Sequence, residues 1–321
     1  RSSDLPPQTH TFGRYYEVSL IDGENAEITQ KQMYNNWYYS SAEYYSGLGT
    51  DYPVWAFAED YVQGFMNLTY VEGNPNTFNT PISLSMNDIA YDYRGDRMLG
   101  VKYGRIYKIQ LDGDRPGTSE LLYDYADHNN LKPITIAVDL DGTVYFVSTS
   151  VDGTDNSLLY KFEYDEEMGM ADLDSDPVEV GDLGWPARKI QTMAFNHKTR
   201  ELFWWACDQD GNSQLKRVNK ETAECENKTD VLNTEMAGLI FEFDYRPYNV
   251  TCINEEGSLV SCKAYHTSDE AKIEMINQAV AERREFQKAD RMGQYFKPGD
   301  MKTAVGDEEY CYLWNITEDE V

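Results

Sequence analysis

Residues 87–111 read NDIAYDYRGDRMLGVKYGRIYKIQL, and this stretch contains the repeating unit that decides the fold. An apolar strand ends at Ala90, a polar turn and a second apolar strand follow, and a third strand comes after a glycine-containing turn. Residues 134–164 (ITIAVDLDGTVYFVSTSVDGTDNSLLYKFEY) and residues 191–219 (QTMAFNHKTRELFWWACDQDGNSQLKRVN) follow the same order. The alternation and the turn residues predict a three-stranded meander for each unit.

The units recur at the length of a propeller blade. Ala90, Ala137, Ala194 and the similar Ala237 in EMAGLIFEF are 47, 57 and 43 residues apart. One meander cannot cover both of its own faces, so several must stack around an axis, and radial closure also removes exposed sheet edges. We therefore predict an all-β protein, a β-propeller of about five or six blades.

The repeats resemble a known group. The order apolar-Ala-Tyr/Phe-Asp/Asn, turn, Leu-Tyr/Phe-Trp, turn, Leu-Tyr-Lys-Val across residues 86–243 is similar to the degenerate propeller repeats, YncE-like or NHL-like, of bacterial secreted and surface proteins. The WD40 and kelch signatures are missing from the sequence. The resemblance implies a propeller and leaves the activity open, because this fold hosts binding, scaffolding and several chemistries.

Four parts are expected along the chain: a mobile lead (residues 1–11), the propeller repeats (12–266), a helical insertion (267–300), and a closing strand with the C-terminal tail (301–321). Residues 12–20 and 309–316 both alternate as strands, and we expect them to pair and close the ring. Ser268 can cap the predicted helix, whose apolar stripe either packs on the propeller or binds a partner.

Composition limits the partners and the compartment. The 321 residues have a formal net charge of -28, which argues against nucleic acid as a partner. The apolar runs are too short for a transmembrane segment. Because the chain starts at Arg1 without a leader pattern, we expect an extracellular or cell-surface protein that is processed before Arg1 or lipid-anchored.

Aromatic residues supply the candidate ligand-binding positions. Residues 35–70 are the most aromatic stretch, and rings with polar tips can stack on sugars or anchor a protein interface. Neighbouring rings in an extended strand cannot both point inward, so one ring of Trp204 and Trp205 is expected at the surface. The candidates are Trp37, Tyr39, Tyr45, Tyr52 and Trp205. The alternative is that these rings fill the core of the first blade.

Acidic turns are the candidate metal sites. Asp139 with Asp141, and Asp208 with Asp210, place oxygen ligands in short loops, as calcium requires. Neither turn completes an EF-hand, and Asp-Gly is also a favoured hairpin turn, so calcium remains the alternative interpretation and no other cofactor is expected. For the tripeptide Arg94-Gly95-Asp96, a turn is likewise the main interpretation and an adhesion motif is the alternative.

The five cysteines do not have the spacing of a zinc site. Cys252 and Cys262 flank a predicted hairpin turn and could face each other across two strands, so a disulfide and free thiols both remain open.

The usual catalytic motifs, such as GxSxG, GxGxxG and HExxH, do not occur, and His128 and His197 are expected in exposed loops. The sequence favours a non-enzymatic module for binding, adhesion or assembly, whose ligand is a glycan or a protein surface. One alternative is a propeller enzyme acting on sugars or lactones with paired carboxylates or calcium. Another is a subunit of a surface assembly. Axial carboxylates of raised pKa would favour the enzyme.

Overall fold

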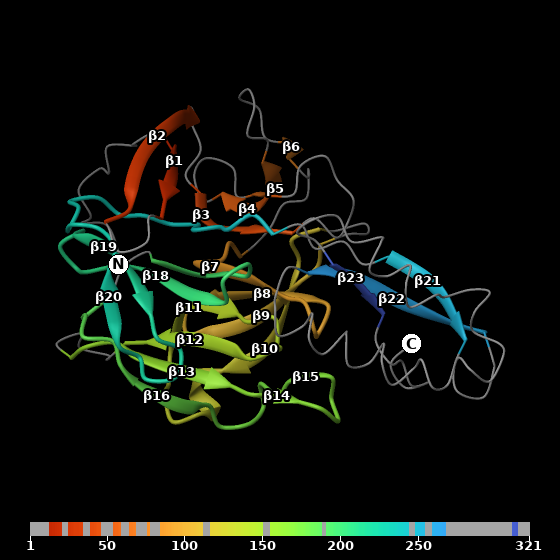
Figure 1. The fold of residues 1–321 in the computed structure, drawn as a ribbon. Helices are drawn as coiled ribbons and strands as arrows, with labels where there is room; N and C mark the ends of the chain where they lie inside the picture. The colour runs from red at the N-terminus through yellow and green to blue at the C-terminus, as the bar shows by residue number, and fades with distance from the viewer. Residues whose placement is uncertain are drawn as a thin grey trace. The chain divides into compact units, whose positions relative to one another are not determined.

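The computed structural model describes residues 13–20, 25–34, 39–45, 54–58, 64–68, 76–77, 84–111, 116–149, 155–187, 191–243, 248–253, 259–267 and 310–313. These residues form β-strands and one short 3-10 helix, Tyr125–Asp127 (Figure 1). They include no helix with the length and apolar character needed to span a membrane. The predicted all-β class is confirmed.

Four four-stranded antiparallel sheets follow one another along the chain. The first blade comprises β3 (Tyr39–Tyr44), β4 (Val54–Ala58), β5 (Gly64–Leu68) and β6 (Asn76–Thr77); the second comprises β7 (Asp88–Asp92), β8 (Arg97–Lys102), β9 (Arg105–Ile109) and β10 (Ser119–Asp124). The third comprises β11 (Pro133–Val138), β12 (Val144–Ser148), β13 (Leu158–Phe162) and β16 (Val178–Asp182), with the small ribbon β14 (Tyr164–Asp165) and β15 (Met170–Ala171) before its last strand. The fourth comprises β17 (Thr192–Asn196), β18 (Glu201–Cys207), β19 (Ser213–Val218) and β20 (Cys225–Asn227). The three predicted meanders are confirmed, and each gains a fourth strand.

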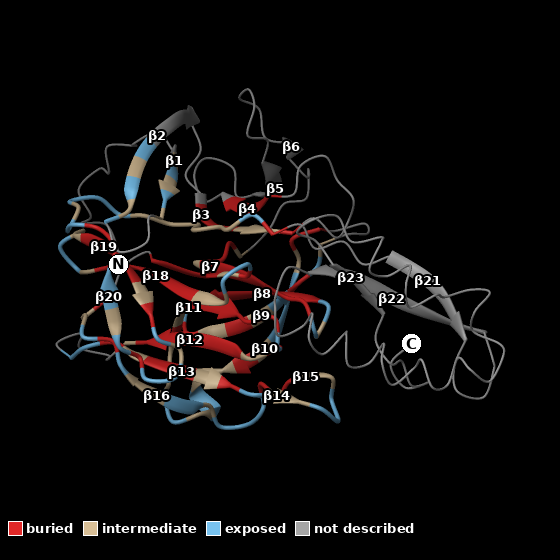
Figure 2. Ribbon diagram, in the orientation of Figure 1, coloured by how far each residue is buried: buried red, intermediate tan, exposed pale blue. Residues whose placement is uncertain are grey.

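The blades stack on one another through their sheet faces, with their first strands adjacent. Strand β7 lies against β3 and β11, and β11 lies against β17. One apolar cluster joins the second and third blades through Leu99 and Phe146, and another joins the third and fourth through Tyr145 and Trp204. Every residue of β7 and β8 is buried, and Figure 2 shows the same for much of β11 and β12. Strands apolar on both faces and stacked around their first strands are the blades of a β-propeller.

The expected strand around Ala237 is wrong. Residues 233–243 have no regular secondary structure, although residues 236–241 are mostly apolar. Instead, Ile240 packs against the core of the first blade, while Leu239 and Phe241 pack against the core of the fourth. This segment therefore lies between the first and fourth blades, where the first strand of another blade would stand. Whether the ring has five or six blades stays a prediction.

The two strands expected to close the ring each pair with a neighbour in the chain, and their pairing with each other stays a prediction. Residues 13–19 form β1 (Gly13–Ser19), which pairs with β2 (Glu27–Tyr34), and β23 (Tyr310–Leu313) pairs with β22 (Leu259–Thr267). A hairpin partner a few residues away is reached at little entropic cost, whereas a terminus-to-terminus pairing must close most of the chain. In the first hairpin, Val18 and Ile28 pack against the fourth-blade core.

Residues 45–51 and 243–321 form a second compact unit. Its described strands are β21 (Tyr248–Ile253), β22 and β23, in that order in one antiparallel sheet. The register places Cys252 opposite Val260 and Cys262 opposite Val250, so the two cysteines are not directly opposed, contrary to the arrangement considered for a disulfide. Apart from Thr267, which ends β22, the predicted helical insertion lies outside the described residues, and the predicted domain boundaries stay predictions.

Candidate functional site

A ring of polar residues occupies one repeat position on the first strands. Two residues before the repeat alanine, the four blades carry Ser40, Asp88, Thr135 and Thr192, and all four are buried. Asp88 is the only ionisable member of this set. The equivalent residues of the next two blades are both threonines, whose hydroxyls can donate to a carboxylate.

The carboxylate of Asp88 connects three blades. It accepts hydrogen bonds from the hydroxyl of Thr135 and the backbone N–H of Ile136, the latter at 3.1 Å, both on β11. It also accepts from the hydroxyl of Thr192 at 2.9 Å and the backbone N–H of Met193 at 3.0 Å, both on β17. Burial raises the pKa of Asp88 to about 7, and these four donors only partly oppose that effect.

Glu43 on β3 is a second carboxyl of raised pKa. Its carboxylate accepts from the backbone N–H of Tyr44 at 2.7 Å and from that of Tyr91, on β7, at 3.2 Å. Burial, together with a smaller effect of the negative charge of Asp88, raises its pKa to about 8. Two interacting carboxyls therefore titrate near neutral pH on neighbouring first strands, an arrangement that can hold blades together or exchange protons.

Sequence analysis missed both carboxyls. Asp88 could have been found by aligning the repeats on their alanines, because that alignment sets an aspartate beside two threonines. Glu43 has no comparable signal, since the equivalent residues are Tyr91, Val138 and Phe195.

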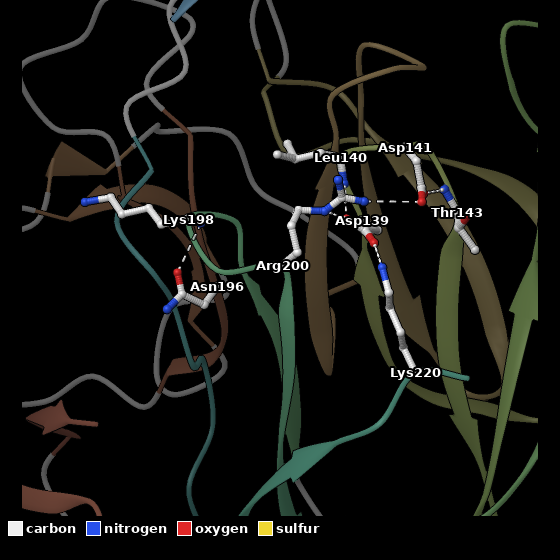
Figure 3. Close-up of polar contacts among 8 residues, drawn as sticks. All are labelled: Asp139, Leu140, Asp141, Thr143, Asn196, Lys198, Arg200 and Lys220. Carbon is white, nitrogen blue, oxygen red and sulfur yellow. Dashed lines mark hydrogen bonds and ion pairs between the residues drawn. The ribbon is translucent and has the colours of Figure 1, made fainter. Parts of the chain in front are cut away.

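The predicted metal residue Asp139 lies in an ion-pair network between the third and fourth blades (Figure 3). Its Oδ1 accepts from Arg200 Nε at 2.6 Å, and its Oδ2 accepts from Lys220 Nζ. Arg200 also reaches Asp141 Oδ2 at 3.3 Å, while the other oxygen of Asp141 accepts from the backbone N–H of Thr143. Burial alone would raise the pKa of Asp139, but the hydrogen bonds from the two cations outweigh it and lower the pKa. A calcium ion at Asp139 would have to displace both cations.

The second predicted metal turn is closed by its own hydrogen bonds. Asp208 Oδ1 accepts from the backbone N–H groups of Asp210 and Asn212, both at 2.9 Å, and Oδ2 accepts from the Asn212 amide at 3.0 Å. Within the described ranges, no three His, Cys, Asp or Glu side chains are grouped as metal ligands would be. These contacts are those of Asx turns, and calcium binding stays the untested alternative interpretation.

The aromatic candidates do not form an exposed surface in the described residues. Trp204 and Trp205 are both buried, so the expectation that one of them is exposed is wrong. Trp205 donates from its indole N–H to Ser213 Oγ at 3.0 Å, on a blade face covered by the first hairpin and residues 236–241. Tyr45 is buried as well.

Of the remaining aromatic candidates, Tyr39 begins β3, but its side chain is not described, and Trp37 and Tyr52 lie outside the described residues. Their role as ligand-binding residues stays a prediction.

His197 is buried rather than exposed, with its ring 5.2 Å from that of Tyr93 and 6.0 Å from that of Phe195. His128 is largely buried too, and its ring stacks on Tyr123 at 4.5 Å. The expectation of exposed loop histidines is therefore wrong for both residues. Each histidine fills a gap beside aromatic rings, where a flat side chain packs well.

The Arg94-Gly95-Asp96 segment is the turn between β7 and β8. Both charged side chains contact the rest of the propeller: the Arg94 guanidinium lies 4.3 Å from the Tyr164 ring centroid, and Asp96 Oδ1 accepts from the Tyr91 hydroxyl at 2.6 Å. The turn interpretation is confirmed, and an integrin-type role stays untested.

No family model and no curated protein matches the chain. Similar solved structures include the nidogen/laminin complex (16% identity, 78% of this chain and 89% of that chain, TM-score 0.41). They also include TolB from Acinetobacter baumannii (8% identity, 68% and 53%, TM-score 0.39) and the PQQ-bound aldose sugar dehydrogenase of Streptomyces coelicolor (12% identity, 56% and 75%, TM-score 0.28). Because each TM-score is below 0.5, the assignment of a propeller rests on the blades themselves. The narrower resemblance to YncE-like or NHL-like repeats stays a prediction.

Proposed function

We propose that this chain is a non-enzymatic binding module that recognises a glycan or a protein surface through the loops and hairpin tips at the ends of its blades. The observation that carries the proposal is the use of Asp88. Both oxygens of this carboxylate are occupied by donors from β11 and β17, so this buried group acts as an acceptor that joins blades. Loops on such a rigid scaffold are the usual position for recognition residues.

A second buried carboxylate, that of Asp139, also contacts residues of a neighbouring blade. The buried Asp139 is neutralised by Arg200 and Lys220, which belong to the neighbouring blade. A carboxylate held by two cations is a poor nucleophile and a poor general base, because its pKa is lowered. Asp88 and Asp139 therefore support a role in holding blades together.

The experiment measures, on one set of glycans, both binding of the chain and cleavage of the bound sugar. The purified chain is applied to a broad glycan array with and without calcium, and retained sugars are then analysed for cleavage. We expect retention without a cleaved product. Cleavage that disappears in Glu43→Gln would contradict the proposal. Glu201→Gln, a matched change at a carboxylate away from the first strands, serves as the control.

A second candidate function is a hydrolytic enzyme, and one observation favours it. Glu43 and Asp88 have pKa values raised to about 8 and about 7, the range in which a carboxyl can act as general acid. For this function a substrate must reach Glu43, the less buried of the two. Turnover with a pH profile that shifts in Glu43→Gln would identify the enzyme.

The proposal places the protein outside the cell or at its surface, either alone or within an assembly. Its support is the strongly acidic, turn-rich composition, since high net charge of one sign keeps an unaccompanied protein soluble. Secretion by the native host, followed by detection in the medium or on intact cells, tests this part separately.

A further inference from the structure

One face of the fourth blade carries a buried lysine beside an apolar core. The register sets one residue from each strand of this blade in a row, and the side chains of that row share a face: Met193, Trp204, Lys216 and Asn227. Met193 and Trp204 belong to the apolar cluster between the third and fourth blades. Lys216 stands in the same row and is only 5% exposed. Burying an ammonium group is costly unless acceptors and a negative charge compensate it.

The Lys216 ammonium has only neutral acceptors. Its Nζ donates to Gln214 Oε1 at 3.0 Å and to Asn227 Oδ1 at 2.8 Å, and it lies 4.6 Å from a ring centroid of Trp185. Among the described residues, no carboxylate forms an ion pair with it. Burial lowers the pKa of Lys216, as expected for an ammonium that no carboxylate compensates. Two of its three N–H groups are used, so one remains for another acceptor.

The indole N–H of Trp185 is a buried donor without an acceptor. Trp185 lies in the connection between β16 and β17, and its carbonyl accepts from the backbone N–H groups of Ser157 and Ala187 at 2.9 and 3.0 Å, so its backbone is held in place. Its ring packs against the same apolar cluster, yet its Nε1 is buried and has no hydrogen-bond partner. Because buried N–H groups are nearly always paired, this one calls for an acceptor that the described chain does not supply.

The side-chain amide of Gln191 is a further buried donor. Gln191 comes two residues before Met193 and therefore lies on the same face of the blade. Its Oε1 accepts from Trp204 Nε1 at 2.6 Å, and this bond fixes the amide, because the reverse orientation would bring two donors together. The Nε2 group is left buried without a partner. Gln191 and Lys216 thus flank Trp204 on either side, and we call Trp185, Gln191 and Lys216 the donor cluster.

We propose that the donor cluster binds the carboxylate of a small acidic sugar, a uronic acid. The proposal rests on the binding function proposed above and names the ligand class of one site. The unmet groups are all donors, so the ligand must supply acceptors. A water molecule could accept from them, but it would leave the charge of Lys216 uncompensated.

The charge and the shape of the cluster favour a carboxylate on a sugar ring. Lys216 supplies one positive charge, which a carboxylate balances, whereas a sulfate or phosphate dianion would add net negative charge to a chain whose formal charge is already -28. Trp185 is only partly buried, so the remainder of its ring can contact the apolar face of the sugar. Its position between two blades also agrees with recognition at the blade ends.

The test uses the full chain labelled with nitrogen-15 at its tryptophan indoles, and follows the indole N–H signals by NMR during titration with D-glucuronate. Trp185→Phe assigns the signal of Trp185. D-glucose has the same ring without the carboxylate and is the neutral control, while inorganic sulfate and phosphate are the alternative anions. We expect glucuronate to shift the Trp185 proton downfield, because this N–H gains an acceptor, and glucose to leave it unchanged.

Two variants report on the other members of the cluster. Lys216→Met keeps the apolar stem and removes the charge, and it should weaken binding about tenfold. Gln191→Glu keeps the acceptor for Trp204 and places a carboxylate beside the donors, so it should abolish binding while the variant stays folded. Lys198→Gln, at an exposed lysine in another turn, is the control and should bind as the wild type does. Circular dichroism confirms folding of each variant.

The proposal is overturned if glucuronate does not bind, if it shifts other indole signals and not that of Trp185, or if Lys216→Met and Gln191→Glu bind it as well as the wild type. It is also overturned if glucose, sulfate or phosphate binds the cluster more tightly than glucuronate. A neutral glycan retained on the array, with no response to glucuronate at Trp185, would leave the binding function standing and remove only this site.

Discussion

The carboxylate of Asp88 on β7 accepts a hydrogen bond of 2.9 Å from the hydroxyl of Thr192 on β17, 104 residues further along the chain. The Thr192 hydroxyl in turn accepts from the backbone N–H of Leu239, at 3.0 Å, in the segment between the fourth and first blades. One polar chain therefore runs from the second blade through the fourth to the residues that follow it. Hydrogen bonds between residues so distant in sequence stabilise the arrangement of blades rather than any single blade.

Removing this carboxylate should weaken the propeller strongly. Asp88→Ala leaves two hydroxyls and two backbone N–H groups buried without their acceptor, so we expect a loss of about 3 to 5 kcal/mol in the free energy of unfolding. Urea unfolding measures the effect. Asp141→Ala, at an exposed aspartate, is the control and should change stability by less than about 1 kcal/mol. Equal losses in the two variants would contradict the role of Asp88.

Stability should fall as pH rises through neutrality. Folding raises the pKa of Asp88 from 3.8 to about 7 and that of Glu43 from 4.5 to about 8. Between these values the folded protein keeps protons that the unfolded chain has released, so this contribution is fully present below about pH 4 and is lost as pH rises through about 7 to 8. Urea midpoints between about pH 5 and pH 8 test it. The urea midpoint should depend less on pH in the double variant Glu43→Gln, Asp88→Asn. A wild-type midpoint that rises over this pH range would contradict the prediction.

In the ion-pair network around Asp139, removing the shared carboxylate should destabilise the protein more than removing one of its two cations. Asp139→Ala leaves Arg200 and Lys220 without their shared, buried acceptor, and we expect a cost of about 3 kcal/mol. Lys220→Met removes one of two cations from a carboxylate that keeps Arg200, so its cost should be smaller. Thermal unfolding ranks the two variants, and the reverse order would show that the network is not centred on Asp139.

Two glycines with nearly the same φ angle should respond differently to substitution by alanine. Gly184 and Gly238 have φ +66° and +67°. At Gly184 no atom lies within 4 Å of the position that a Cβ would take, whereas at Gly238 the Cβ and N of Ala42 would lie at 3.0 and 3.1 Å. Gly184→Ala should cost about 1 kcal/mol from backbone strain alone, and Gly238→Ala about 3 kcal/mol. Equal costs, measured by urea unfolding, would show that residues 236–241 do not pack tightly on the first blade.

The sequence predicted the first three strands of the second, third and fourth blades because their apolar residues recur at regular spacing. It missed the fourth strands, since outer strands such as β10 and β20 are mostly exposed and lack that pattern. Trp205 was misplaced for a related reason. The alternation indicates that neighbouring rings lie on opposite faces of a sheet. It does not show that both faces of the fourth blade are covered by other residues.

The contacts of the buried carboxyls could not be predicted from the sequence for a different reason. The donors to Asp88 lie 47 and 104 residues away, and a lone aspartate in an apolar strand has no local pattern that announces them. The acidic turns at Asp139 and Asp208 did have a local pattern, but that pattern fits an Asx turn and a metal loop equally well. Only the positions of Arg200 and Lys220, which come from the next blade, show how Asp139 is used.

The claim that Asp88 fastens the blades is tested most directly by a double-mutant cycle of Asp88→Asn and Thr192→Val, read as free energies of unfolding in urea. The cycle cancels the separate loss of the Leu239 hydrogen bond in Thr192→Val and isolates the coupling between the two side chains. We predict a coupling energy of about 1 kcal/mol or more. Free energies that add to within about 0.3 kcal/mol would contradict the claim and return Asp88 to the set of candidate catalytic groups.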